Sequence, residues 1–209
     1  MIVEVFASGP AETNSVLVCT DSSPQAVLFD APLHCVTHWQ SRLKQLGKTV
    51  GTLLITHSHW DHIADAAAAK KAWNMPVGIH KEDVGNLEKP GSDGLPLWFP
   101  IEGIGADFYV VNGEEKRICD LKVCVMHTPG HTSGCVCYYL PDLKVVISGD
   151  TLFQGSIGNL SFATARPKLM EASLKTLLNL PADTVVMPGH GDATTIGKEQ
   201  GIIKRFFYD

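Results

Sequence analysis

The sequence predicts an α+β fold in which two mixed β-sheets pack face to face, with helices on the outside. Short apolar or alternating segments typical of strands occur in both halves of the chain, and segments with helical spacing lie among them. Some neighbouring strands are separated by turn residues that suit a hairpin, and others by a helix that suits a crossover. With 209 residues and no linker or repeat, the chain is expected to form one domain, residues 1–209.

Strands are expected where β-branched and apolar residues gather between turn-forming residues. These segments are residues 2–6, 15–19, 26–30, 52–56, 77–80, 109–111, 121–126, 136–140, 145–148 and 184–187. Helices are expected at residues 36–46, 63–73 and 168–180 and from residue 198 onward. Residues 89–105 are rich in proline and glycine and are expected to form a long loop. The apolar residues between Leu95 and Ile101 make this loop a candidate pocket wall.

Composition narrows the classes of function. Hydrophobic residues make up 44% of the chain and charged residues 19%, which is typical of a globular protein. The formal charge is −5 and no run of lysine or arginine is present, so nucleic acid is a poor candidate partner. The N-terminal residues do not resemble a secretory signal, and no segment is long and apolar enough to span a membrane. We therefore expect a cytoplasmic protein with a small-molecule partner and no membrane or nucleic-acid partner.

The cysteines are expected to be reduced, mostly buried thiols. None of the six forms a Cys-x-x-Cys pair, and a domain of this size needs no disulfides. Cys135 and Cys137 alternate along an expected strand and should share one of its faces.

A dense group of metal-binding residue types follows the strand expected at 52–56. His57 and His59 are two positions apart, so their imidazoles point to the same side of an extended chain. Asp61 and His62 come where the chain turns into a helix, and they can face a second centre. Asp61 alone would also suit a helix cap, but three histidines and an aspartate within six residues are hard to explain by packing. Imidazole and carboxylate ligands suit zinc, iron or manganese.

Three later strand ends repeat this pattern. His131, Asp150 and His190 each follow a glycine and lie just past an apolar segment. A single aspartate at a strand end is more often a turn or helix cap. The convergence of several strand ends on the same residue types favours one metal site.

Taken in order, these motifs resemble the metallo-β-lactamase superfamily. They read His-x-His-x-Asp-His, then Gly-His, Gly-Asp-Thr and Pro-Gly-His-Gly. The segments Thr-Pro-Gly-His-Thr-Ser-Gly from Thr128 and Gly-Asp-Thr-Leu-Phe-x-Gly from Gly149 look most like its glyoxalase II-like branch, here in a short single-domain form. The similarity extends from about Thr13 to Gly191. It implies an αββα sandwich, the metallo-β-lactamase fold, with a dinuclear metal centre at one edge.

The resemblance also implies a role for each residue. Two divalent metal ions per chain are expected, with zinc favoured over iron or manganese. Asp30 matches an early aspartate of the family that holds a metal ligand in place, although a cap of the next helix explains it equally well. The implied ligands are His57, His59 and His131 for one ion, Asp61, His62 and His190 for the other, and Asp150 as the bridge.

The sequence departs from glyoxalase II enzymes at positions that concern glutathione. Those enzymes carry a lysine or arginine beside the second glycine of a Gly-x-x-Gly stretch, whereas Gly158 is followed here by Asn159. Ser161 stands where a related branch has aspartate. We interpret Asn159 as a substrate-binding position without the cation that would meet a glutathione carboxylate. The C-terminal helical domain of those enzymes is also expected to be missing. Recognition of glutathione is therefore expected to be weak.

A dinuclear centre predicts hydrolysis. Two metal ions lower the pKa of a shared water, so that a metal-bound hydroxide attacks a carbonyl carbon near neutral pH. Asp61 is the expected catalytic residue, because its carboxylate can orient the nucleophile or relay its proton. No Gly-x-Ser-x-Gly elbow offers a serine nucleophile. The sequence thus predicts a metal-dependent hydrolase, glyoxalase II-like, that cleaves an S-acylglutathione or another small thioester or ester.

Other functions remain open within the same motif set. A mononuclear iron persulfide dioxygenase would need only the equivalents of His57, His131 and Asp150, and a lactonase would share the whole centre. The remaining histidines have simpler interpretations. His127 is expected to pack near the centre or support it, and His34 and His38 to lie on an ordinary amphipathic helix.

Overall fold

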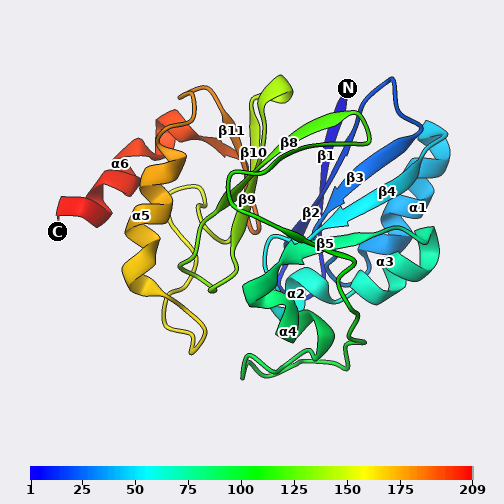
Figure 1. Cartoon of the computed structure of the whole chain (residues 1–209), viewed down its shortest axis with the longest axis horizontal. Helices are drawn as coiled ribbons and strands as arrows, with labels where there is room; N and C mark the ends of the chain where they lie inside the picture. Colours follow the sequence, from blue (N-terminus) through cyan, green and yellow to red (C-terminus); the bar gives the residue numbers. More distant parts are fainter. Residues whose placement is uncertain (209) are drawn as a thin grey trace.

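Two six-stranded sheets pack face to face in the computed structural model, which describes residues 1–208 (Figure 1). The first sheet contains, in spatial order, β1 (Ile2–Ser8), β2 (Thr13–Cys19), β3 (Gln25–Phe29), β4 (Thr49–Leu54), β5 (Val77–His80) and β6 (Phe108–Val110). The second contains β12 (Thr194–Thr195), β11 (Val185–Pro188), β10 (Val145–Gly149), β9 (Val136–Leu140), β8 (Leu121–His127) and β7 (Glu115–Ile118).

Both sheets are mixed. In the first, β1, β2 and β3 pair antiparallel, and β3 to β6 pair parallel. In the second, β7 to β10 form an antiparallel meander, β11 joins β10 parallel, and β12 closes antiparallel. The parallel pairs are connected through helices, as parallel strands require. Their carboxyl ends consequently lie along one edge of each sheet.

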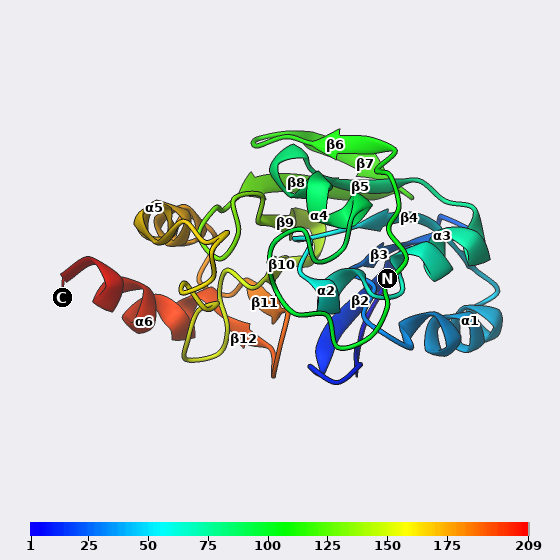
Figure 2. The same ribbon diagram turned by 90° about the horizontal axis from the view of Figure 1, so that it is seen from below.

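Helices cover both outer faces (Figure 2). The first sheet is covered by α1 (Cys35–Leu46) and α3 (Ala66–Trp73), and the second by α5 (Pro167–Leu177) and α6 (Ile196–Tyr208). The short helices α2 (Trp60–Ile63) and α4 (Val84–Glu88) lie at one edge of the sandwich, at the bottom of Figure 1. Single 3₁₀ turns occupy η1 (Lys81–Asp83) and η2 (Pro141–Leu143).

Apolar side chains form three layers: under α1 and α3, between the sheets, and under α5 and α6. Between the sheets, the rings of Phe29 and Tyr138 lie 5.4 Å apart. The buried Tyr138 hydroxyl donates a hydrogen bond to the Ile55 carbonyl oxygen at 2.8 Å, which satisfies its polar group and links β9 to the chain leaving β4. The layered core fixes the sheet edge on which the polar residues gather.

The predicted fold class is confirmed: two packed mixed sheets have helices on both outer faces. The strands predicted at Val77–His80 and Val136–Leu140 match the structure, and residues 89–105 contain no helix or strand. The two-residue β12, the one-turn helices and the charged edge strand β7 were not predicted. They are too short or too polar to give a clear periodic pattern.

The single helix predicted at 63–73 is wrong, because the chain breaks between α2 and α3. Backbone bonds to the loop after β3 replace the helical ladder there. The Ala31 N–H donates to the His62 carbonyl, and the Asp65 N–H donates to the Ala31 carbonyl, each at 2.8 Å. Likewise, β3 ends before Asp30, whose φ of 56° leaves the strand conformation. Both departures from the predicted elements occur at the sheet edge, next to His62 and at Asp30.

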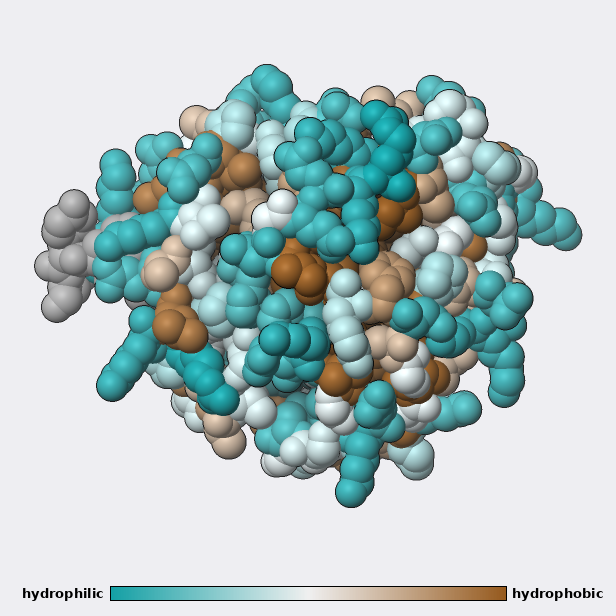
Figure 3. Space-filling view, viewed as in Figure 1, coloured by the Kyte–Doolittle hydropathy of each residue, from teal (hydrophilic) through white to brown (hydrophobic). Residues whose placement is uncertain are grey.

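The face of the molecule that Figure 3 shows is mostly polar. On the face shown in Figure 3, hydrophobic side chains form small separate groups among hydrophilic ones. None of the helices in the described part of the chain is long and apolar enough to cross a membrane. All six cysteines are free thiols, and Cys135 and Cys137 are buried as expected.

Candidate metal centre

The histidines and aspartates predicted from strand ends meet at one edge of the sandwich. His57 and His59 lie on the segment between β4 and α2, and His131 lies on the β8–β9 loop. Asp150 directly follows β10, and His190 follows β11. Because these strand ends face the same edge, residues up to 133 positions apart in sequence come together.

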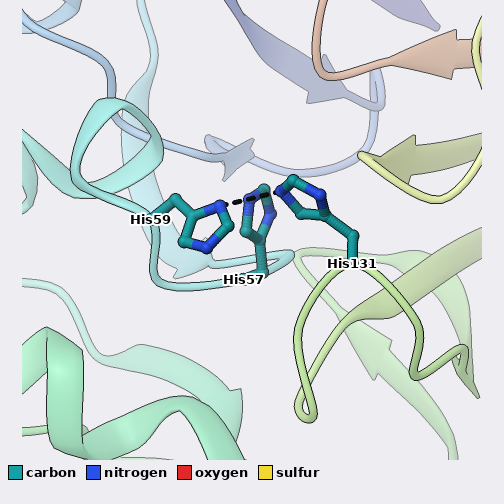
Figure 4. A group of neighbouring side chains, drawn as sticks. All are labelled: His57, His59 and His131. Atoms are coloured by element: carbon teal, nitrogen blue, oxygen red, sulfur yellow. Dashed lines mark hydrogen bonds between the residues drawn. The ribbon is translucent and has the colours of Figure 1, made fainter. Parts of the chain in front are cut away.

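One group consists of three buried imidazoles. His57, His59 and His131 each offer a nitrogen within 4.8 Å of the others. The Nδ1 atom of His59 lies 2.8 Å from Nε2 of His131, and the His57 ring centre lies 4.8 Å from that of His59. Figure 4 shows the three rings turned toward one another from two loops. This arrangement can hold one metal ion through nitrogen ligands.

The other group mixes carboxylate and imidazole. Oδ2 of Asp61 lies 3.5 Å from Nε2 of His62 and 3.3 Å from Nε2 of His190. His62 is buried, whereas the side chain of His190 is 29% exposed. This second group is therefore the more open of the two.

Asp150 lies between the two groups. Its Oδ1 is 3.3 Å from Nε2 of His62, and its Oδ2 is 3.3 Å from Nε2 of His131. Oδ2 also lies 3.6 Å from Nε2 of His190. One carboxylate thus reaches both groups, which is the geometry that a bridging ligand requires.

Buried polar atoms without partners show that these residues fit metal ions. A buried nitrogen or oxygen with no hydrogen bond is costly, and four such atoms in the described structure belong to the cluster: His57 Nε2, His59 Nε2, His62 Nε2 and Asp150 Oδ1. Divalent metals prefer nitrogen and carboxylate oxygen donors of this kind. Bound ions would satisfy donors that the protein alone leaves unpaired.

Asp30 holds His62 of the second group through the ring nitrogen that faces away from the cluster. Its Oδ2 accepts hydrogen bonds from His62 Nδ1 at 2.8 Å and from the Thr56 hydroxyl at 2.7 Å, and its Oδ1 accepts from the Thr56 N–H at 2.7 Å. The next helix has His34 at its N-cap, and the Asp30 carboxylate does not cap it. Asp30 thereby orients the His62 ring, with Nε2 facing the cluster.

Backbone carbonyls orient two more imidazoles. Nδ1 of His131 lies 2.8 Å from the carbonyl oxygen of Asn159, and Nδ1 of His190 lies 3.1 Å from that of Ala11. A proton on each Nδ1 leaves Nε2 as the free ligand atom. The main chain of Asn159 thus belongs to the site.

The side chain of Asn159 shapes its own loop. Its oxygen accepts hydrogen bonds from the N–H and the hydroxyl of Ser161 at 2.8 and 2.7 Å.

Asp83 is a supporting residue that sequence reasoning missed. Its buried carboxylate accepts from the Ser58 N–H at 3.0 Å, the Thr132 hydroxyl at 2.8 Å and the Gly134 N–H at 2.7 Å. It therefore ties the loop of His57 and His59 to the loop of His131. No motif marks Asp83, but its position just after β5, parallel to β4, places it at the same sheet edge.

Two imidazoles of the first group, those of His57 and His59, are held neutral. Burial, with the neighbouring His131 adding to it, lowers the pKa of His59 to about 3. Burial also lowers the pKa of His57 well below its ordinary value, with His62 and His59 adding to the effect. Neutral imidazole is the form that binds metal.

In the second group, neighbouring carboxylates determine the pKa of His62. Burial alone would lower the pKa of His62, but Asp61, Asp30 and Asp150 raise it well above the ordinary value. Burial would raise the pKa of Asp61, yet the adjacent His62 and a hydrogen bond from His190 lower it. Without metal, opposite charges attract one another around His62, although its Nε2 makes no hydrogen bond to any residue that the structure describes.

Aromatic rings flank the cluster. The Phe162 ring lies 5.3 Å from His59 and 5.5 Å from His131, edge to face. The Phe153 ring lies 6.0 Å from that of His190. Apolar surface thus borders both groups.

The long loop contributes a further aromatic surface. Trp60, between His59 and Asp61 in sequence, packs against Trp98 at 5.2 Å and Phe99 at 5.7 Å. Trp98 is 65% exposed. The predicted apolar segment therefore lies over the residue that joins the two ligand groups.

The other histidines lie outside the cluster. His127 stacks on His80 with ring centres 4.0 Å apart, and His38 stacks on Phe6 at 3.7 Å. His34 is exposed at the start of α1. Among the described residues, none of the four joins a group able to hold a metal.

Comparison with known proteins shows the family. The model of the family described as the metallo-beta-lactamase superfamily matches residues 8–190. A probable metallo-hydrolase YqgX from Bacillus subtilis (strain 168) is 32% identical over 197 residues, which cover 92% of this chain and 91% of that protein. A hydroxyacylglutathione hydrolase GloC from Haemophilus influenzae (strain ATCC 51907 / DSM 11121 / KW20 / Rd) is 28% identical over 204 residues, which cover 96% and 95%.

Solved structures agree with this result. The crystal structure of the BLEG-1 B3 metallo-beta-lactamase has a TM-score of 0.89 and 33% identity, with 96% of this chain and 97% of that chain covered. The crystal structure of TTHA1623 in a di-iron-bound form has a TM-score of 0.81 and 34% identity, with 94% and 96% covered. The chain belongs to the metallo-β-lactamase superfamily.

Proposed function

We propose that this protein is a metal-dependent hydrolase that cleaves a small thioester or ester with two metal ions. The observation that carries the proposal is the cluster of nitrogen and carboxylate donors in which Asp150 reaches both groups and four buried donor atoms lack partners. The described site contains no serine or cysteine whose hydroxyl or thiol pairs with a cluster histidine as an activated nucleophile would. We propose a small molecule as the partner, not nucleic acid or a membrane.

The ligand roles follow from the two groups. His57, His59 and His131 would hold one ion, and Asp61, His62 and His190 the other, with Asp150 bridging. Such ions lower the pKa of a bound water and polarise a carbonyl oxygen. The chain's own contribution is to fix the ligand nitrogens through Asp30 and the Asn159 and Ala11 carbonyls.

Asp61 is proposed as the catalytic carboxylate. The Thr13 hydroxyl donates a hydrogen bond of 2.6 Å to its Oδ2, which restrains the side chain. At 12% exposure it is accessible to water, and its pKa is lowered by His62 and His190 against the effect of burial. An ionised carboxylate so placed can orient a water and accept its proton.

The metal is proposed to be zinc, with iron as the principal competitor. Histidine and carboxylate ligands accommodate either, and a structural relative, TTHA1623, was crystallised in a di-iron-bound form. Elemental analysis of protein purified without chelator should find up to two ions per chain.

The substrate is proposed to be a thioester for which glutathione is not strongly selected. A relative of nearly the same length is described as a hydroxyacylglutathione hydrolase, so thioester cleavage suits this chain length. Asn159, however, offers no cation to a glutathione carboxylate, and its side chain bonds within its own loop. Loss of a charge-assisted contact lowers affinity by about ten- to a hundredfold.

A substrate panel tests the proposal. S-lactoylglutathione, simple thioesters, lactones and aryl esters are compared by kcat/KM, with zinc-loaded and iron-loaded protein. We expect thioesters to be cleaved fastest and S-lactoylglutathione to show a high KM. A low KM for S-lactoylglutathione would refute weak glutathione selectivity alone. One iron per chain with oxygen consumption on glutathione persulfide, and no hydrolysis, would replace the hydrolase by a persulfide dioxygenase.

A further inference from the structure

A cavity of about 460 Å³ lies beside the metal centre, where β5 and β8 end and α5 begins. It contains none of the proposed ligands, although Pro129 and Ser133 in its lining are each two residues from His131. Side chains that donate hydrogen bonds dominate its polar wall: His80, Lys81, Asn112, His127, Ser133 and Arg166.

The stacked pair of His80 and His127 presents a defined donor. Nδ1 of His80 accepts a hydrogen bond from the Glu82 N–H. Burial, helped by the neighbouring His127, lowers the pKa of His80 to about 4, so the ring is neutral at pH 7. A neutral imidazole that accepts at Nδ1 carries its proton on Nε2. His127 is held in turn by a 2.9 Å contact between its Nε2 and the Ser133 carbonyl.

Arg166 and Asn112 add oriented donors. Nη1 of Arg166 donates to the carbonyls of Thr164 and Ala165 at 3.1 and 3.0 Å, which anchors the guanidinium and leaves Nη2 and Nε for a ligand. The side-chain oxygen of Asn112 accepts from the His127 N–H at 2.9 Å, so its amide nitrogen is the group left to donate. Such fixed donors suit an anion.

The charge of the lining is positive. Lys81 and Arg166 face a single acid, the exposed Glu82. This contrasts with the chain as a whole, whose formal charge is −5. A local cationic surface on an acidic protein attracts an anion to this place in particular.

The cavity adjoins a second one that reaches the metal centre. A smaller cavity of about 200 Å³ is lined by His59 and also by Glu82 and Ser133, which line the larger one. Glu82 and Ser133 form the boundary between the two cavities, so a molecule held at the metal centre would pass them to reach Arg166.

We propose that the cavity lined by His80, Asn112, His127 and Arg166 binds a carboxylate or phosphate group of the substrate, while the scissile bond lies at the metal centre. The link to the substrate rests on the proposed hydrolase function; the anion site itself does not. It adds a substrate class to that function: thioesters or esters with an anionic group remote from the carbonyl.

Anion binding is tested first without any reaction. Histidine imidazole signals of the metal-loaded protein are followed by ¹H–¹⁵N NMR while inorganic phosphate is added. We expect saturable shifts for His80 and His127, and a weakening of the phosphate Kd by about tenfold or more in Arg166→Gln. Arg117→Gln, which removes an exposed arginine on β7, is the matched control and should leave the Kd unchanged. Shifts confined to the histidines of the metal centre would overturn the site.

The link to substrate is tested with paired thioesters. S-benzoyl mercaptoalkanoates of increasing spacer length are compared with their N-methylamides, which lack the charge. We expect the wild-type protein to prefer the carboxylate of at least one spacer length, and Arg166→Gln to lower kcat/KM for that compound about tenfold, with no effect on its amide. Equal rates for every pair would overturn the substrate role. Hydrolysis of neither member would refute the proposed function, and the phosphate titration would still decide the anion site.

Discussion

The two ligand groups of the cluster are built from similar residues but are held in different ways. His57, His59 and His131 are buried, and loops tied together by Asp83 carry them. The group of Asp61, His62 and His190 is held by other side chains, chiefly Asp30 and Thr13, and its outer histidine is partly exposed.

The two groups therefore differ in the protonation state of the imidazoles that a metal ion would bind. The first group offers two neutral imidazoles, because burial lowers the pKa of His57 and His59. In the second, carboxylates raise the pKa of His62 against the effect of burial, so this imidazole must lose its proton before it can bind a metal ion. We infer that the first group is the preorganised part and that the second depends on its supporting carboxylates.

The largest effect should come from removing the first group. His57→Ala combined with His59→Ala deletes two of its three nitrogens, so we expect one ion to be lost and hydrolysis to fall to the background rate. His190→Ala should lower activity but leave one ion bound. Metal per chain and thioester hydrolysis are measured, with His38→Ala as the control outside the cluster. Full metal content in the double variant would break the assignment of the first group.

Metal removal should lower thermal stability. An ion that binds only the folded state stabilises by about 2.7 kcal/mol at a hundred times its Kd, which corresponds to about 5–10 °C in Tm for a chain of this size. Tm is recorded before and after chelation, with metal loss verified by elemental analysis. The double histidine variant should show a smaller shift. An unchanged Tm at verified metal loss would contradict the metal-fit argument.

Asp30→Asn should weaken the second group more than the first, which Asp30 reaches only through Thr56. Asparagine preserves the shape but removes the charge that faces His62 Nδ1, and changes to such supporting residues typically cost about ten- to a hundredfold in metal affinity. Competition with a chromophoric chelator measures the affinity of each ion. Equal weakening of both ions would show that the two groups are not supported independently.

Asp83→Asn is the counterpart for the first group. Asparagine has one oxygen where aspartate has two, so either the Ser58 or the Gly134 N–H loses its acceptor. We expect the free energy of unfolding to fall by about 1–3 kcal/mol. The first ion should also be held less tightly. Urea unfolding and the same chelator competition measure both effects. Gly134→Ala is a parallel variant, since an added Cβ would lie 2.5 Å from Asp83 Oδ1. Tight binding of the first ion in both variants would refute the proposed tie between the loops.

The sequence predicted that the proposed ligand residues lie together, but it did not predict all the residues that hold them in place. The ligands follow apolar strands and flanking glycines, so local patterns place them at one sheet edge. Asp83 has no such pattern, because its importance comes from three partners on two distant loops. The helix predicted at 63–73 was wrong for the same reason: Ala31 supplies tertiary hydrogen bonds that local periodicity does not encode.

The smallest effect is expected from Trp98, which packs on Trp60, the residue between His59 and Asp61. Its ring packs against Trp60 and is 65% exposed, so Trp98→Ala should change stability little while removing apolar surface near the centre. An aromatic pair contributes about 0.5–1.5 kcal/mol, so we expect KM for a benzoyl thioester to rise about two- to tenfold, with kcat and metal content unchanged. KM for an acetyl thioester, which has no ring, should stay the same. Tyr109→Ala removes another exposed aromatic residue, on β6, and should affect neither substrate. Equal increases in KM for both thioesters would indicate a general disturbance of the loop, and no increase would remove Trp98 from the pocket wall.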